Sequence, residues 1–255
     1  MKDKFHEFTD SQWQILEEII GDTRKRKHSL RIILNAIFWI NNTGCQWRNL
    51  DSKYPVWQTV FYHFTKFKER GIWEQIQDIL VVSERERQGK EASPSLVAID
   101  SQSVKKVQFV SIETGIDGNK YVNGRKRTII VDKLGLPISV KVTAANISDN
   151  LAGILAIDKL KGKAPRLKKV AADKGYKQTF KEYVETSYEC VVEIVQKPES
   201  SKGFVPEKNR WQVERSFSWL NLRRRLFKDV EKTIEAAEAM LEIAFTSIML
   251  NRLAK

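Results

Sequence analysis

Three acidic residues of this sequence stand where their carboxylates can be brought together. Asp100 and Asp173 each directly follow a short apolar run, and Glu214 lies among arginines in the segment 209–225. Carboxylates at the ends of adjacent strands point at one spot, and a helix packed over that edge can add a third. Such a set of hard oxygen ligands suits Mg²⁺ or Mn²⁺ beside a phosphate backbone.

Two ions about 4 Å apart in such a site activate water or a 3′-hydroxyl and stabilise the leaving oxygen of a displacement at phosphorus. Each acid alone also has a plainer explanation. Glu214, flanked by Arg210 and Arg215, can form a surface salt bridge. Asp100 and Asp173 can cap the turns that follow their strands. The hypothesis of a metal site therefore depends on the three acids meeting.

The segment 209–225 has the periodicity of an amphipathic helix that would carry Glu214. Apolar residues recur at steps of four and three, which predicts one buried face. Polar and charged residues recur at steps of four on a neighbouring face. The apolar face is Val213, Phe217 and Leu220, and the neighbouring face is Arg210, Glu214 and Ser218.

The elements around the two aspartates alternate in type. An apolar run, a β-rich hairpin and then alternating helical and strand patterns predict a mixed α/β sheet with flanking helices. That order is the order of a ribonuclease-H-like fold. The predicted elements are strand 96–99, hairpin 127–142, a helix from 149, strand 168–172, helix 182–186, strand 190–195, a loop at 198–203, helix 209–225 and helix 234–253.

The first 82 residues predict a small helical domain, with helices at about 9–20, 30–41, 55–70 and 72–82. Short helices joined by tight turns are typical of a helix-turn-helix-like unit, in which 55–70 would contact DNA. A purely structural or dimerising role remains an equal alternative. The polar stretch 83–95 predicts a linker, and 96–255 the second domain.

The net charge of +12 and the pI of about 9.6 predict a polyanionic partner, nucleic acid being the commonest. Most of that charge lies in 96–255, while 1–95 carries about +2. The basic segment 24–27 is either a solvated linker or an arm that contacts phosphates. Cys45 and Cys190 lie far apart and have no zinc-binding spacing. The charged start of the chain and the lack of a long apolar run favour the cytoplasm, at the bacterial nucleoid.

Several motifs resemble those of bacterial insertion-sequence transposases of the DDE class, in the group that contains insertion-sequence family five. They span nearly the whole chain in the family's order, and the last three are the specific ones. The motifs are T-G-C-Q-W-R-N-L (43–50), P-V-W-Q-T-V (55–60), A-I-D-S-Q-S-V-K (98–105), N-G-R-K-R-T-I-I-V-D-K-L-G-L-P (123–137), A-A-D-K-G-Y (171–176) and R-W-Q-V-E-R-S-F-S-W-L-N-L-R-R-R-L (210–226).

The resemblance implies that Asp100, Asp173 and Glu214 bind two Mg²⁺ ions, or Mn²⁺ as a substitute, with Asp100 bridging them. It implies hydrolysis of phosphodiesters at terminal inverted repeats, followed by attack of the freed 3′-hydroxyl on target DNA. Double-stranded DNA would be the partner, bound by a homodimer, with no small-molecule substrate. Related catalytic helices often have Tyr and Lys where this chain has Glu207 and Asn221, so those two roles are not assigned.

Basic residues next to these motifs predict contacts with DNA phosphates. Ordinary solvated surface is the alternative for each of them. Trp211 and Trp219 could stack on a displaced base, although their spacing favours packing in the core. The predicted DNA-binding residues are Lys105, Arg125, Lys126, Arg127, Lys174, Arg210, Arg215, Arg223 and Arg224.

Two other functions fit much of the same pattern. One is another ribonuclease-H-like nuclease, such as a junction resolvase or repair nuclease, which the helical N-terminal region disfavours. The other is a regulator derived from a transposase, which binds DNA ends without cutting them. The presence of all three acids favours an active enzyme.

Overall fold

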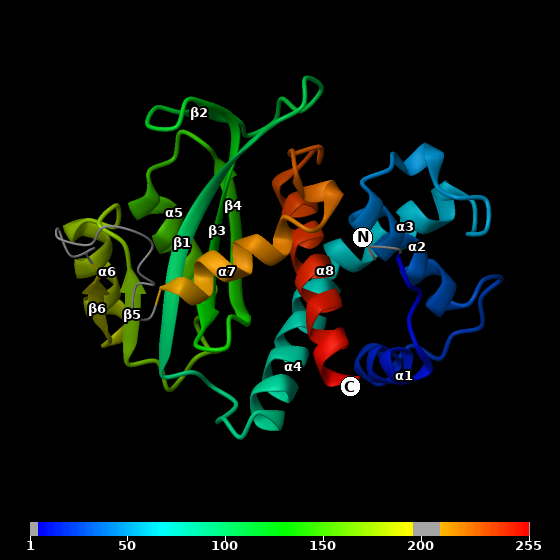
Figure 1. The fold of residues 1–255 in the computed structure, drawn as a ribbon, viewed down its shortest axis with the longest axis horizontal. Helices are drawn as coiled ribbons and strands as arrows, with labels where there is room; N and C mark the ends of the chain where they lie inside the picture. Colours follow the sequence, from blue (N-terminus) through cyan, green and yellow to red (C-terminus); the bar gives the residue numbers. More distant parts are fainter. Residues whose placement is uncertain (1–4, 196–209, 255) are drawn as a thin grey trace, which may run out of the picture.

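The computed structural model describes residues 5–195 and 210–254. Helices and a mixed sheet alternate through this part of the chain (Figure 1). The helices are α1 (Asp10–Ile20), α2 (Leu30–Thr43), α3 (Trp57–Glu69), α4 (Ile72–Arg87), α5 (Asp149–Asp158), α6 (Gln178–Tyr188), α7 (Trp211–Leu220) and α8 (Ile234–Leu253), with short 3₁₀ turns η1 (Trp47–Asn49) and η2 (Arg224–Leu226). The strands are β1 (Leu96–Lys105), β2 (Gly115–Asp117), β3 (Val122–Asp132), β4 (Pro137–Ala144), β5 (Lys169–Ala172) and β6 (Val191–Ile194).

The sheet is antiparallel on one side of β1 and parallel on the other. β1 pairs antiparallel with β3, which pairs antiparallel with β4 and, near its start, with β2. On its other side β1 pairs parallel with β5, and β5 pairs parallel with β6. This is the strand order of a ribonuclease-H-like fold, so the predicted fold class is confirmed.

Helices cover both faces of the sheet. α7 crosses β1 and β3 on one face, and α5 packs on the opposite face, with α6 beside it (Figure 1). Side chains alternate between the faces along each strand. In β1, Ser101 therefore points to the face where its hydroxyl meets Tyr176, and Asp100 points to the face that α7 covers.

The last helix, α8, joins the N-terminal helices to the sheet. It packs against α4, α2 and β4, and Figure 1 shows it between the sheet and helices α1 to α3. The side-chain amide of Asn41 in α2 donates to the carbonyl oxygen of Met240 in α8 at 2.9 Å. Buried residues of both parts of the chain form one core cluster. The helical part thus includes the C-terminal helix as well as residues 1–82.

The predicted linker 83–95 begins too early. α4 continues to Arg87, because two of its charged side chains are buried with partners instead of being solvated. Arg85 forms an ion pair with Asp132 and donates to the carbonyl oxygens of Glu91 and Ala92. A polar sequence can continue a helix when tertiary contacts satisfy its charges, which composition does not reveal.

Other boundaries also differ from the sequence predictions. The connection between α2 and α3 is not a tight turn, since it contains η1 and spans 44–56. The helix predicted over 209–225 ends at Leu220, and the strand predicted to end before Asp100 continues to Lys105. The loop predicted at 198–203 lies outside the described residues. None of the helices within 5–195 and 210–254 has the length and hydropathy of a membrane span.

Candidate active site

The register of β1 and β5 brings the two aspartates together. The parallel pairing matches Leu96 with Lys169 and Ala98 with Ala171. Continued by two residues, the same register sets Asp100 beside Asp173 and directs both side chains to one face. β5 ends at Ala172, while β1 continues as the partner of β3. Asp100 therefore lies in the middle of a long strand, at the edge where its parallel neighbour stops.

The Asp100 carboxylate is mostly buried. Burial, reinforced by the nearby charge of Asp173, raises the pKa of Asp100 to about 6. The Ser101 backbone N–H donates to its Oδ1 at 2.7 Å, and the positive charges of Arg210 and Lys120 partly offset the increase in pKa. A buried acid facing a second acid is stabilised as a carboxylate when a cation binds between them.

A glycine leaves the space that Asp173 needs. The Asp173 Oδ1 accepts a hydrogen bond from the Gly175 N–H at 2.8 Å. A Cβ at Gly175 would lie 2.9 Å from Asp173 Oδ1 and 3.4 Å from Asp149 Oδ2. Asp149 begins α5 and pairs with Lys126 at 2.7 Å. The D-K-G-Y motif therefore positions one predicted ligand and leaves room for a further carboxylate beside it.

Glu214 lies in the first turn of α7, over the face of the sheet that carries Asp100. Its side chain is 43 % exposed, and the Arg210 guanidinium lies 4.0 Å from its Oε1 and 3.7 Å from Asp100 Oδ2. Arg210 itself is buried. The structure thus places Arg210 between two of the three predicted acids.

Contacts with the β3–β4 turn fix the position of α7. The buried Ser216 hydroxyl lies 2.9 Å from the Gly135 carbonyl oxygen and 2.8 Å from that of Gln212. Arg215 donates to the Leu134 carbonyl oxygen at 2.8 Å. Gly135 has φ +75, and a Cβ there would lie 2.9 Å from the Arg215 guanidinium. The G-L-P turn between β3 and β4 therefore packs directly against Arg215 and Ser216, the two residues after Glu214.

Two tryptophans enclose the Arg215 guanidinium. It lies 4.4 Å from the ring centroid of Trp211 and 4.7 Å from that of Trp219. The Arg252 guanidinium also lies over the Trp219 ring, at 4.6 Å. Cation–π contacts of this kind stabilise a partly desolvated arginine. The Arg215 side chain therefore holds α7 on the sheet, and its predicted contact with DNA stays a prediction.

The structure buries the three β3 cations for which the sequence predicts phosphate contacts. Arg125 is fully buried and donates to the Asp229 carboxylate at 3.2 Å and to carbonyl oxygens in 112–113 and 231–233. Arg127 donates to the Leu226 carbonyl oxygen at 2.8 Å, and burial lowers its pKa to about 10. Lys126 is 5 % exposed. β3 lies between two strands and has both faces covered, so its cations face protein.

The remaining predicted cations divide into two groups. Arg210 is buried between the acids, and Arg223 is held by Asn42 and by Ser247, each at 2.8 Å. Both side chains contact protein groups in this arrangement. The side chains that the structure leaves exposed are Lys105, Lys174 and Arg224.

Sequence reasoning missed three residues near the acids. Asp149 lies beside Asp173, and the charge of Lys120 acts on Asp100. Tyr176 is buried, its hydroxyl meets that of Ser101 at 2.9 Å, and burial raises its pKa well above the usual value. The motif A-A-D-K-G-Y contained Tyr176, but no sequence signal linked Asp149 or Lys120 to the site.

The donor chemistry fits divalent metal ions, although the side chains do not yet form a complete ligand set. All three predicted ligands are carboxylates, and the buried Asp100 faces Asp173. Within the described residues, no three His, Cys, Asp or Glu side chains lie close enough together to hold one ion. The Arg210 guanidinium lies between Asp100 and Glu214, at 3.7 and 4.0 Å from their carboxylate oxygens.

Fold and site together define a class: a ribonuclease-H-like protein with acids gathered where its central parallel strands end. Comparisons with known proteins then give the family. The family model "Transposase DDE domain" matches residues 91–250, more than half of the chain. A second model, "Putative transposase of IS4/5 family", matches residues 8–77. The chain belongs to the DDE-domain transposases, enzymes that cut DNA and transfer strands, which confirms the predicted function.

Other comparisons add little. No curated protein is similar enough to this chain to count as a match. One solved structure with a significant match is "Crystal structure of the Mos1 mariner paired end complex with Mn", with 12 % identity and a TM-score of 0.32. The match covers 95 % of this chain and 83 % of that one. A likeness this distant says nothing about individual residues.

Proposed function

We propose that Asp100, Asp173 and Glu214 are the metal ligands and catalytic acids of this transposase. The observation that supports this most strongly is the β1–β5 register, which sets Asp100 beside Asp173 under α7. Two Mg²⁺ ions, or Mn²⁺ in their place, would lower the pKa of bound water and neutralise charge on the reacting phosphate. Asp100, which lies beside Asp173 and shares Arg210 with Glu214, would be the central metal ligand.

In this proposal Arg210 moves when the site is loaded. Its guanidinium now neutralises Asp100 and Glu214, and a metal would replace it between them. The released guanidinium would then lie beside the DNA strand, where a planar cation binds phosphate in a bidentate way. Glu214, the most exposed of the three acids, would turn toward Asp100.

The reaction proposed for the loaded site has two steps at the same acids. The acids orient a water molecule for attack on a phosphodiester at the terminal inverted repeat, and a 3′-hydroxyl is released. That hydroxyl then attacks a phosphodiester of the target, so one bond forms as another breaks and no external energy source is needed. The exposed Lys105, Lys174 and Arg224, with Lys120, would hold the strands on either side.

Two ends must be held together for transfer, so we expect a homodimer on DNA. Either N-terminal or catalytic surfaces could form it. A chain with a net charge of +12 that acts on bacterial DNA would work in the cytoplasm, at the nucleoid.

A cleavage assay tests the assignment. A labelled duplex carrying the inverted repeat is incubated with Mg²⁺, Mn²⁺ or EDTA and the wild type, Asp100→Asn or Glu214→Gln. We expect nicking at the repeat boundary only with metal, reduced about a thousandfold or more in both variants. End binding in EDTA should stay within a few-fold of wild type. Glu182→Gln, an exposed glutamate of α6, is the matched control and should cut normally.

Other results would change the proposal. Loss of end binding in Asp100→Asn would make that residue structural. Binding without cutting under every metal would favour the regulator, and cutting that ignores the repeat would favour a general nuclease.

A further inference from the structure

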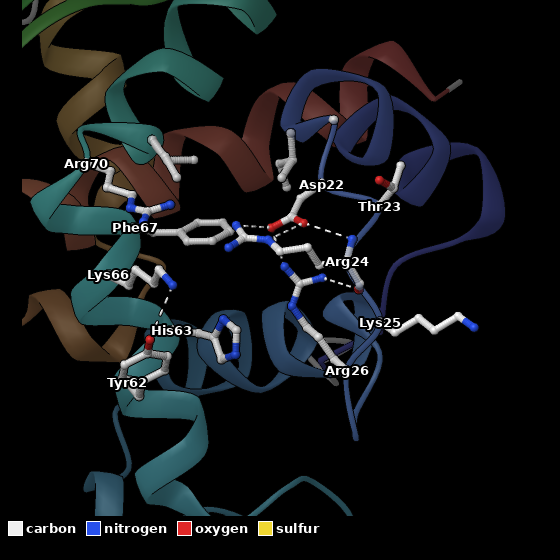
Figure 2. A pocket seen from close by; sticks show the side chains of 13 residues that line it. Asp22, Thr23, Arg24, Lys25, Arg26, Tyr62, His63, Lys66, Phe67 and Arg70 are labelled. Atoms are coloured by element: carbon white, nitrogen blue, oxygen red, sulfur yellow. Dashed lines mark hydrogen bonds and ion pairs between the residues drawn. The ribbon is translucent and has the colours of Figure 1, made fainter.

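A basic cleft lies between the turn after α1 and helix α3. Its volume is about 590 Å³, and its walls come from the 20–26 segment on one side and from α3 on the other. Figure 2 shows Arg24 and Arg26 around Asp22, with Lys66 of α3 and Arg70, the residue that follows this helix, on the other side. The cleft belongs to the helices on the far side of α8 from the sheet (Figure 1), so it is separate from the catalytic acids.

The cleft concentrates positive charge in a part of the chain that is nearly neutral overall. Residues 1–95 carry a net charge of about +2, yet five cations and one acid line this cleft, a net charge of +4. Figure 2 shows Lys25 pointing away from the other four cations. Within 5–195 and 210–254, Lys66 and Arg70 have no ion-pair partner. Cations held close together without enough acids favour an anion between them.

Asp22 organises the two arginines. Arg24 donates to it through Nε at 3.1 Å and through Nη2 at 2.9 Å, and Arg26 forms an ion pair with the same carboxylate. Arg26 also donates to the Arg24 carbonyl oxygen at 3.0 Å. One carboxylate shared by two guanidinium groups leaves donors of both available to a further acceptor. The ordering cost of these side chains is therefore met before a ligand binds.

The α3 wall adds an exposed aromatic side chain with a polar end. Tyr62 is 57 % exposed, and Lys66 donates to its hydroxyl at 3.3 Å. His63 follows it in the cleft wall. Hydroxyl, lysine and arginine donors along one helix match the phosphate contacts that position DNA-binding proteins.

We propose that this cleft binds the phosphodiester backbone of the DNA duplex on which the enzyme acts, and so sets α3 against that duplex. Arg24 and Arg26 would contact one phosphate from the turn, and Lys66 and Arg70 a neighbouring phosphate from the helix. The inference rests on the proposed function for its ligand, the transposon end, but it uses none of the catalytic residues.

The test measures binding of the full chain to a fluorescent terminal-repeat duplex in EDTA, by anisotropy over a range of salt concentrations. Lys66→Glu and Arg70→Glu should each weaken binding about tenfold or more near physiological salt. In Lys66→Ala and Arg70→Ala, the slope of log K against log salt should fall by about one for each lost phosphate contact. Lys90→Glu makes the same charge change at an exposed site after α4, outside the cleft, and should leave affinity nearly unchanged.

Three results would overturn the inference. One is unchanged affinity and salt slope in the cleft variants. Another is an equal loss in Lys90→Glu, which would mean that only total charge matters. The third is altered sedimentation of the free variants with normal DNA binding, which would make the cleft a contact between copies. Thermal melting checks that Lys66→Glu is as stable as the wild type. If Lys66→Glu is destabilised, DNA affinity and salt slope are measured on Lys66→Ala instead.

Failure of the cleft proposal can be told apart from failure of the catalytic assignment. Asp100→Asn and Glu214→Gln keep the cleft, so they should bind ends with the wild-type salt slope whether or not those acids catalyse cleavage. A chain that loses end binding through the cleft variants, while the acid variants still cut, would support the cleft and reject the catalytic assignment.

Discussion

At the scale of single residues, similar aspartates have different tasks. Asp100, Asp132 and Asp173 all follow β-rich runs. Asp132 accepts hydrogen bonds from the N–H groups of Leu134 and Leu136, at 2.8 and 2.9 Å, and pairs with Arg85. It therefore shapes the turn that holds α7. Asp100 and Asp173 instead face each other.

Gly175→Ala tests the space beside Asp173. The new Cβ would lie 2.9 Å from Asp173 Oδ1, closer than such contacts allow, so the carboxylate must move. We expect cleavage to fall at least tenfold while end binding is kept. The comparison is Gly118→Ala, where a Cβ meets nothing within 4 Å and φ is not positive. Equal activity of the two variants would show that Asp173 is not held in this way.

At the scale of elements, Glu214 depends on how α7 is seated. The helix has a buried face of Val213, Phe217 and Leu220, as its periodicity predicted. That face fixes which side packs on the sheet, but not the position along it. The contacts of Arg215 and Ser216 with the β3–β4 turn fix that position.

Ser216→Ala tests this contact between α7 and the β3–β4 turn. The change removes the side-chain donor to the Gly135 carbonyl oxygen in a buried place, so we expect a loss of about 1–3 kcal/mol in stability. Cleavage should fall further than stability accounts for, with a changed metal dependence, because Glu214 shifts.

Ser218→Ala is the matched control on the same helix. Within residues 5–195 and 210–254, its exposed hydroxyl bonds only to the Glu214 carbonyl oxygen of the same helix, at 3.1 Å. Both variants gain a similar helix propensity, because alanine is a better helix former than serine. Urea unfolding and nicking rates of the pair therefore isolate the contact with the turn. Identical behaviour of the two would mean that this contact does not position Glu214.

At the scale of the whole molecule, charged residues join the sheet to the helices. Lys163 pairs with Glu74 and Asp78 of α4, both at 2.7 Å, and Lys159 lies 3.5 Å from Glu74 and from Glu238 of α8. Glu242 of α8 is buried near the same lysines, and burial raises its pKa to about 7. The catalytic sheet and α8 thus meet partly through an ionic interface.

Glu242 makes stability fall as pH rises. Its folded pKa of about 7 exceeds the ordinary value of 4.5, so the folded state binds more protons between those values. The stabilising contribution is fully present below pH 4.5 and is lost as pH rises through 7. Glu242→Gln should therefore be more stable than wild type at pH 8, by up to about 3 kcal/mol, with a smaller difference near pH 5.

Glu235→Gln on the same helix should change stability at pH 8 in the opposite direction. Glu235 is exposed, and hydrogen bonds at the helix start lower its pKa, chiefly one from its own backbone N–H. Its carboxylate stabilises the fold above its usual pKa, so the substitution should destabilise the protein at pH 8. Urea unfolding at pH 5 and 8 measures both variants. A Glu242→Gln variant less stable than wild type at pH 8 would contradict the raised pKa.

The sequence by itself determined the order of helices and strands along the chain and the buried faces of the helices, and it singled out three acids for a proposed site. Period-two and period-3.6 patterns are local properties, and so is the capping box that Thr9 and Gln12 form at the start of α1. The end of α8 at Leu253 also followed from its apolar pattern. The family resemblance, carried by local motifs, then named the fold and the reaction.

Only the tertiary structure decided which charges are free. Arg125 and Arg127 look like DNA contacts in sequence, but β3 lies inside the sheet and both side chains are buried. The cleft of Arg24, Arg26, Lys66 and Arg70 joins residues from two separate segments, which no local pattern could pair. Burial and long-range proximity depend on how elements pack, so a cation's task is set by the fold and not by its neighbours in sequence.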